Sequence, residues 1–258
     1  MNRVAFNLGF IEIYWYSLII LLGIIIANIY LLREGKKDKL DLVKLSDLIF
    51  YTIIFGLLGA RIYYVLFNLD YYFKHPSEIL AFRNGGLAIH GGIIFGTLFI
   101  IYYCHKHKKN VWQILDLIAP TLLIGQIIGR YGNFINQEAH GPITTLSFLN
   151  KFHLPTFIIK GMYINGSYYH PTFLYESFWN FIGLILILTI KSKVKNKQGF
   201  IVGFYLLWYS IGRFCIEILR TDSLMLGNVK IAMIVSIMLA VIGIIIMIKT
   251  WKRGKRNE

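Results

Sequence analysis

Residues 129–141, GRYGNFINQEAHG, concentrate polar and charged side chains directly after the apolar run LIAPTLLIGQII. Arg130 and Asn133 are three residues apart, so a helix would put both on one face. Snorkelling of the arginine, with glycines for close helix packing, is the structural alternative. Glu138 and His140 follow at once and argue against a purely structural role. We therefore interpret this stretch as part of a polar site.

A second charged stripe lies in IGRFCIEILR, where Arg213, Glu217 and Arg220 recur at i, i+4 and i+7. An internal salt-bridge ladder is the structural interpretation of this spacing. The functional interpretation is an anion site, because the arginine fork binds phosphate through bidentate, charge-assisted hydrogen bonds.

Two histidines are candidates for proton transfer. His90 is followed by two glycines, which leave space beside its ring. It could be a structural histidine bonded to a carbonyl, or a general base of pKa about 6.5 for a thiol of pKa about 8.5. His170 precedes Pro171 at a predicted helix entrance, where a capping or entry role competes with catalysis. GxSxG, HExxH and CxxC motifs are absent, so we expect the nucleophile to arrive with a substrate.

Composition places these residues in a membrane. The 258-residue chain is 56% hydrophobic and only 16% charged, with a mean hydropathy of +0.58, whereas soluble domains are about 25% charged. The net charge of +14 comes from basic clusters between apolar runs, as the positive-inside rule expects, and does not indicate nucleic-acid binding. The two cysteines, Cys104 and Cys215, form no disulfide framework or metal-ligand spacing.

Hydropathy predicts an all-α polytopic membrane protein with seven transmembrane helices in one integral-membrane domain, 1–258. Of the 27 Lys and Arg, 17 fall in the segments 33–46, 105–111, 191–199 and 249–258, against six in the alternate segments. This bias predicts an outside N-terminus and a cytoplasmic C-terminus. We expect a retained first span and a small ordered extracytoplasmic cap at 135–171, between spans four and five. The predicted spans are 14–32, 47–67, 88–104, 112–134, 172–190, 200–219 and 229–249.

With this orientation, nearly every ionisable group in the spans falls in the outer third. Charges inside a membrane cost about 2.5–3.5 kcal/mol each and face the bundle interior. Several at one depth indicate a chamber open to one side, whereas a through-pathway needs polar groups across the full thickness. Four arginines facing such a chamber suggest a phospholipid headgroup as ligand; they are Arg61, Arg130, Arg213 and Arg220. An outward-facing phospholipid or organic-anion transporter is the alternative to an enzyme.

Five segments together resemble one family, the bacterial prolipoprotein diacylglyceryl transferases. They are GARIYYVL (59–66), GGLAIHGG (85–92), GRYGNFINQEAHG (129–141), HPTFLYE (170–176) and GRFCIEILR (212–220). The resemblance implies transfer of the diacylglyceryl group of phosphatidylglycerol to the lipobox cysteine thiol of a preprolipoprotein. The product is a thioether, the leaving group is glycerol phosphate, and the location is the bacterial cytoplasmic (inner) membrane with the site on its extracytoplasmic side.

The resemblance also implies site residues. Arg130 and Arg213 would hold the phosphate, His90 would assist thiol deprotonation, and Glu138 and Glu217 would orient the arginines. The identity of the base stays open, because an arginine-rich environment could itself lower the pKa of the thiol. No metal or organic cofactor is required, and the role of 142–169 is open. The substrate-binding set is Tyr16, Arg61, Asn133, Gly141, His170, Glu176, Glu217 and Arg220.

Overall fold

The structure is a computed structural model that describes residues 1–9, 12–82, 85–221, 223–227 and 229–254. The chain forms two compact units. One comprises Met1–Leu31 with Leu115–Glu258, and the other comprises Leu32–Ile114.

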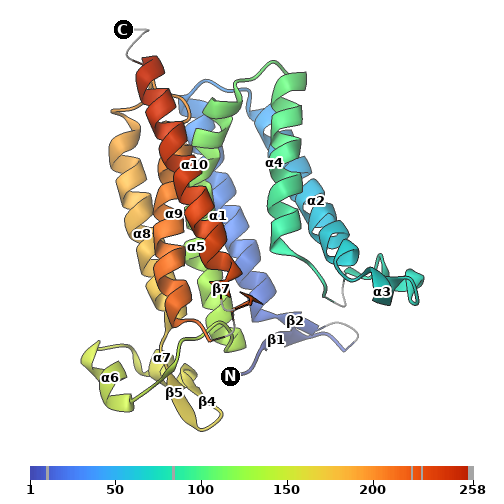
Figure 1. The fold of residues 1–258 in the computed structure, drawn as a ribbon, viewed down its shortest axis with the longest axis vertical. Helices are drawn as coiled ribbons and strands as arrows, with labels where there is room; N and C mark the ends of the chain where they lie inside the picture. The colour runs from blue at the N-terminus through green and yellow to red at the C-terminus, as the bar shows by residue number, and fades with distance from the viewer. Residues whose placement is uncertain (10–11, 83–84, 222, 228, 255–258) are drawn as a thin grey trace. The chain divides into compact units, whose positions relative to one another are not determined.

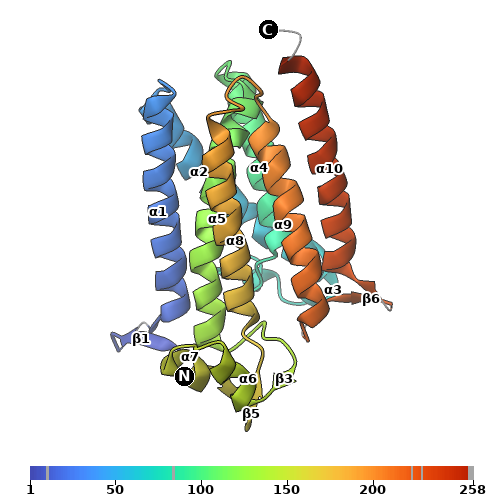
Figure 2. The same cartoon turned by 90° about the vertical axis from the view of Figure 1, so that its left-hand side faces the viewer.

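Five long helices lie wholly or mainly in the larger unit, and they are labelled in Figures 1 and 2. They are α1 (Trp15–Lys37), α5 (Val111–Asn136), α8 (Thr172–Lys191), α9 (Phe200–Leu219) and α10 (Ile231–Gly254). Of these, α9 packs against both α8 and α10. Leucine and isoleucine side chains of α1 and α10 are largely exposed, which suits helices facing lipid.

A reciprocal tryptophan lock joins α8 to α9. Both helices carry the pattern W-x-x-x-G, as WNFIG in α8 and WYSIG in α9. The Trp179 and Trp208 rings stack at 4.3 Å, and each indole N–H donates to the other residue's carbonyl at 3.0 Å. A Cβ atom at Gly183 or Gly212 would lie within 2.4 Å of the opposite ring. Only glycine therefore permits this approach, which fixes the register of the two helices.

Side chains from helix α5 and strand β7 provide partners for the two ends of α9. At its N-terminus, the Asp116 carboxylate of α5 accepts from the backbone N–H groups of Gly199 (2.6 Å) and Val202 (2.8 Å). At its C-terminus, Lys230 Nζ donates to the carbonyls of Glu217 (2.6 Å) and Arg220 (2.7 Å). These bonds supply the partners that a helix terminus lacks, so α9 is held along its axis as well as across it.

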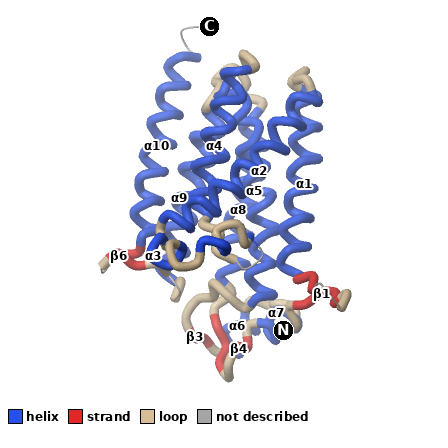
Figure 3. Tube along the Cα trace, turned by 90° about the vertical axis from the view of Figure 1, so that its right-hand side faces the viewer, coloured by secondary structure: helices blue, strands red, loops and turns tan. Residues whose placement is uncertain are grey.

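The segment between α5 and α8 is ordered, as predicted for the cap (Figure 3). Phe134, Leu149, Ile158, Met162 and Phe173 form its apolar core. Because Phe134 comes from α5 and Phe173 from α8, the cap is anchored on the two helices that it connects. Its elements are β3 (Ile143–Thr144), α6 (Leu146–Lys151), α7 (Thr156–Gly161), β4 (Tyr163–Ile164) and β5 (Ser167–Tyr169), with strand order β3-β5-β4, all antiparallel.

Two short hairpins precede helices of this unit. The antiparallel pair β1 (Val4–Asn7) and β2 (Glu12–Tyr14) leads into α1, and the pair β6 (Met225–Leu226) and β7 (Val229–Lys230) leads into α10. The all-α prediction missed these small sheets, because strands of two to four residues give no measurable hydropathy period.

The smaller unit is built on the packing of α2 (Leu42–Leu66) against α4 (Ile89–Lys106). Asp41 caps α2 by accepting from the N–H groups of Val43 and Lys44. A Cβ atom at Gly91 would lie 2.3 Å from the Gly59 carbonyl oxygen, so the two backbones are in direct contact there. The short helices α3 (Leu69–Tyr72) and η1 (Pro76–Glu78) lie between α2 and α4 in the chain.

Each of the seven predicted spans overlaps one long helix. Among the described residues, six helices are long and apolar enough to cross a membrane, namely α1, α2, α5, α8, α9 and α10. The third predicted span, α4, has only 18 residues and ends in His105 and Lys106. A polytopic helical membrane protein is thus confirmed. The count of seven crossings stays a prediction.

Replacing Asp116 with Ala removes the cap from the α9 N-terminus. We expect a loss of about 1–2 kcal/mol in the free energy of unfolding, the usual effect of deleting a helix cap, measured by denaturation of the detergent-solubilised protein. Asp47→Ala, at an exposed position of α2, is the matched control. Equal stability of the two variants would contradict the capping role.

Candidate active site

The centre of the candidate site is one carboxylate shared by two arginines. Arg130 Nη2 of α5 lies 2.5 Å from Glu176 Oε2, and Arg213 Nη1 of α9 lies 3.6 Å from Glu176 Oε1. The Glu176 side chain, from the first turns of α8, is only 5% exposed. Three helices that are distant in sequence therefore meet in a single ion-pair cluster, as the predicted phosphate site requires for Arg130 and Arg213.

Glu217 completes the cluster. Its Oε2 lies 2.6 Å from Arg213 Nη2, and its side chain is 2% exposed. The orienting role predicted for Glu217 toward Arg213 is therefore consistent with the geometry. With two arginines and two glutamates, the cluster is formally neutral. The attraction between the paired charges therefore offsets part of the cost of removing them from water.

Glu138 has different partners from those predicted. Its Oε1 accepts from Asn133 Nδ2 (2.8 Å) and Asn136 Nδ2 (3.4 Å), and its backbone N–H donates to the Asn133 carbonyl. Within the described residues, Glu176 and not Glu138 is the ion-pair partner of Arg130. The amides of Asn133 and Asn136 thus hold Glu138 at the end of α5.

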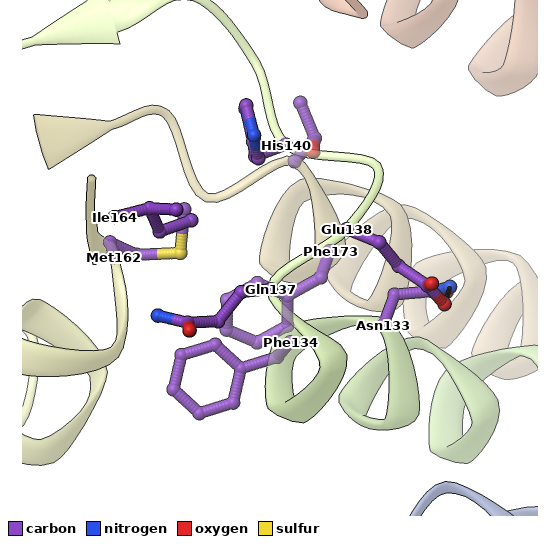
Figure 4. Close-up of a pocket in the computed structure, with 9 residues that line it drawn as sticks. Asn133, Phe134, Gln137, Glu138, His140, Met162, Ile164 and Phe173 are labelled. Atoms are coloured by element: carbon purple, nitrogen blue, oxygen red, sulfur yellow. Dashed lines mark hydrogen bonds between the residues drawn. The ribbon is translucent and has the colours of Figure 1, made fainter. Parts of the chain in front are cut away.

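A small pocket lies beside this asparagine–glutamate pair (Figure 4). Phe134, Phe173, Met162 and Ile164 line its apolar side, and Figure 4 shows the tips of Asn133 and Glu138 meeting away from Met162. Met162 and Ile164 belong to the segment 142–169, whose role the sequence left open. That segment therefore builds part of the wall next to Asn133 and Glu138.

Tyr16 lies against the glycine-rich part of α5. A Cβ atom at Gly132 would be 2.7 Å from the Tyr16 ring, so the absence of a side chain at Gly132 admits the aromatic ring from α1. This contact brings the predicted substrate-binding residue Tyr16 to the same helical turns as Arg130 and Asn133. Gly129 and Gly132 thus provide close approach, as expected from the sequence.

Gly141 and His170 fix where the cap returns to the bundle. The Gly141 N–H donates to the His170 carbonyl at 3.0 Å, and a Cβ atom at Gly141 would lie 2.7 Å from the His170 Cβ. His170 Nδ1 is 3.2 Å from the Tyr175 hydroxyl, and burial lowers the pKa of His170 from its usual 6.5. These contacts favour the entry role for His170, one of the two alternatives left open by the sequence.

The remaining predicted residues divide between the two units. Arg220 is the C-cap residue of α9, in the same unit as the ion-pair cluster. Arg61 and His90 belong to α2 and α4 of the other unit. Arg61 is 4% exposed, whereas His90 is exposed, with its ring 6.2 Å from that of Tyr63. A chamber shared by all these residues stays a prediction.

Sequence reasoning missed three supports of the site. The W-x-x-x-G pattern, present once in α8 and once in α9, could have predicted the tryptophan lock from the sequence. No sequence pattern indicated that Lys230 caps α9, because the residue resembled any other basic group at the edge of a span. Nor did any pattern indicate the buried bond from Gln126 Nε2 of α5 to the Tyr205 hydroxyl of α9 (2.9 Å).

Fold and site together define a polytopic membrane protein with a buried arginine–glutamate cluster at one end of its helices. The model of the family described as prolipoprotein diacylglyceryl transferase matches residues 3–249. Relatives named phosphatidylglycerol–prolipoprotein diacylglyceryl transferase come from Bacillus cereus (strain G9842), Bacillus thuringiensis subsp. konkukian (strain 97-27) and Bacillus anthracis. Each is 47% identical over 258 residues, covering 100% of this chain and 95% of the relative.

The chain belongs to the prolipoprotein diacylglyceryl transferase family. The resemblance seen in the five sequence motifs is thereby confirmed, and the enzyme class is favoured over the transporter alternative.

His170 should make stability depend on pH. Because its folded-state pKa is lowered, the unfolded chain takes up the proton first as the pH falls through about 6.5, so acid favours unfolding. We expect the melting temperature of the wild type to drop between about pH 7.5 and pH 5, and that of His170→Gln to drop less. The exposed His105→Gln variant is the control and should follow the wild type; a His170→Gln curve parallel to the wild type would contradict the assignment.

Proposed function

We propose that this protein transfers the diacylglyceryl group of phosphatidylglycerol to the cysteine thiol of a prolipoprotein. The sulfur attacks the glycerol carbon that carries the phosphate ester. A C–S bond forms as the C–O bond breaks, glycerol phosphate leaves with the electron pair, and the thiol proton goes to a base. Both the names of the relatives and the geometry of the arginine–glutamate cluster support this reaction.

The observation that carries the proposal is the bridging of Arg130 and Arg213 by Glu176. A carboxylate and a phosphate both present two oxygens to guanidinium groups, so two arginines spaced to share one carboxylate are also spaced to share one phosphate. Among the described contacts, only Nη2 of Arg130 faces a carboxylate. In the proposal its other N–H groups would donate to a phosphodiester, so the departing phosphate would be stabilised by donors that are already in place.

The other site residues take supporting roles in this proposal. Glu176 and Glu217 keep the guanidinium groups of Arg130 and Arg213 in place before the substrate arrives. Tyr16, Asn133, Gly141, His170 and Arg220 would line the substrate path near this end of the helices. Glu138, held by Asn133 and Asn136, would act on the acceptor side and not on the arginines.

We further propose that His90 assists removal of the thiol proton. His90 is exposed, so a substrate thiol can reach the ring, and an imidazole nitrogen can accept a proton.

We infer seven crossings, with the N-terminus outside, and a site on the extracytoplasmic side of the bacterial cytoplasmic membrane. The helix α4, about 27 Å long at 1.5 Å per residue, is close to the roughly 30 Å of a bilayer core, so it can serve as the third crossing. The 17-to-6 distribution of basic residues supports the orientation.

Arg130→Ala should insert stably and lose activity by about a hundredfold or more, as expected for the loss of a preorganised cationic donor. The assay incubates purified protein with phosphatidylglycerol and a lipobox peptide, and follows diacylglyceryl mass on the peptide thiol. The activity of Arg130→Lys should lie between that of the wild type and that of Arg130→Ala. Lysine keeps the positive charge but lacks the planar guanidinium that donates two parallel hydrogen bonds. Exposed Arg33→Ala is the control.

Full activity of Arg130→Ala would remove the arginine from the mechanism. A wild-type protein that leaves the peptide unmodified, yet moves phospholipid across liposomes, would contradict the proposed reaction itself.

His90→Gln should lower the rate at neutral pH by about a hundredfold to ten-thousandfold, the usual contribution of a general base. The pH dependence of kcat should also change, because the group proposed to accept the thiol proton is removed. An unchanged rate with an unchanged profile would assign His90 a structural role, and the exposed His105→Gln variant controls for loss of a histidine elsewhere on the same helix.

A further inference from the structure

We propose that Arg61 is a positioning residue that builds the turn preceding α4 and so places His90, and that it does not bind the donor phosphate. The part of this inference that concerns activity rests on the proposed function. The part that concerns the turn stands on contacts within the Leu32–Ile114 unit alone.

The Arg61 guanidinium is enclosed by backbone carbonyls. Nε donates to the carbonyl of Ile79 (2.8 Å) and Nη2 to that of Glu78 (2.6 Å), while Nη1 donates to those of Gly85 (2.8 Å) and Gly86 (3.0 Å). A guanidinium has five N–H donors, and four acceptors surround this one. A phosphate could bind through two donors at once only by displacing bonds that hold two separate chain segments together.

Aromatic rings close the remaining approach. The Arg61 Cζ lies 5.4 Å from the ring centroid of Tyr72 and 6.0 Å from those of Tyr64 and Phe82. Since Arg61 is 4% exposed, its charge is stabilised by carbonyl dipoles and ring faces rather than by water. This environment suits a permanent structural cation better than a site that exchanges anionic ligands.

The same turn runs directly into His90. The Ala88 N–H donates to the carbonyl of Ala60, the residue before Arg61, at 3.0 Å. One residue beyond His90, the Gly91 backbone contacts that of Gly59. His90 is therefore flanked by two backbone contacts with residues 59–60. Arg61 holds the segment that leads into these contacts, through its bonds to the carbonyls of Gly85 and Gly86.

Two adjacent glycines offer a matched pair of variants. Both have left-handed backbones, with φ of +82° at Gly85 and +71° at Gly86, so alanine is similarly strained at either position. A Cβ atom at Gly86 would lie 2.5 Å from Arg61 Nη1, whereas one at Gly85 would meet nothing within 4 Å. Gly86→Ala should thus displace the Arg61 guanidinium and the neighbouring Tyr64 ring. Gly85→Ala adds similar backbone strain at a residue that also bonds Arg61, but without a steric clash.

The experiment compares Arg61→Lys, Gly86→Ala and Gly85→Ala in the full-length protein with phosphatidylglycerol and a lipobox peptide. Arg61→Lys keeps the positive charge but loses the planar set of guanidinium donors. We expect Arg61→Lys and Gly86→Ala to lower kcat at least about tenfold, with less than about a twofold change in the KM for phosphatidylglycerol. Gly85→Ala should retain clearly more activity than Gly86→Ala.

Hydrogen exchange at the Ala88 amide tests the turn independently of activity. It should accelerate in Arg61→Lys and Gly86→Ala more than in Gly85→Ala, while exchange in α9 is unchanged. If Arg61→Lys does not accumulate, Gly86→Ala carries the comparison. A near-normal kcat in Arg61→Lys, a tenfold rise in KM with kcat unchanged, or normal Ala88 exchange would each overturn the proposal. A wild type without transferase activity would overturn only the proposed function, because the exchange result still decides the role of Arg61 in the turn.

Discussion

The site depends on placing two arginines in a membrane without leaving their charges unpaired. Glu176 meets this constraint, because its two oxygens lie 2.5 Å and 3.6 Å from Arg130 and Arg213. An isolated charge in this environment is strongly unfavourable, and removing one member of a buried pair leaves the other uncompensated. The shared carboxylate therefore ties α5, α8 and α9 together and, in the proposed reaction, keeps the phosphate-binding groups at a fixed separation.

The precision of that cluster rests on α9. Its partners fix it in three ways: the stacked pair of Trp179 and Trp208, the Asp116 cap at one end and Lys230 at the other. Each interaction involves a buried or partly buried polar group that has to find a partner, so sliding α9 past α8 would break several at once. A guanidinium on such a helix is preorganised, which is what electrostatic catalysis requires.

The cationic groups that the sequence treated alike have different physical surroundings. Arg130 and Arg213 face carboxylates, which a phosphate can imitate or replace. Arg61 faces backbone carbonyls, whose loss would undo a turn. The partner of an arginine, more than its depth in the membrane, therefore separates the groups suited to bind a substrate from those suited to hold the chain.

The sequence by itself determined the membrane class, the positions of the long helices and the family, because hydropathy, helix length and local motifs are properties of contiguous residues. It also placed Arg130, Arg213 and Glu217 in one site. Only the tertiary structure decided their partners, such as Glu176 between two arginines and the amides holding Glu138. Those choices depend on which faces of three helices, distant in sequence, meet. The Trp179–Trp208 pair, the Asp116 and Lys230 contacts at the ends of α9 and the apolar core of the segment between α5 and α8 set that geometry. All of them are contacts between residues far apart in the chain.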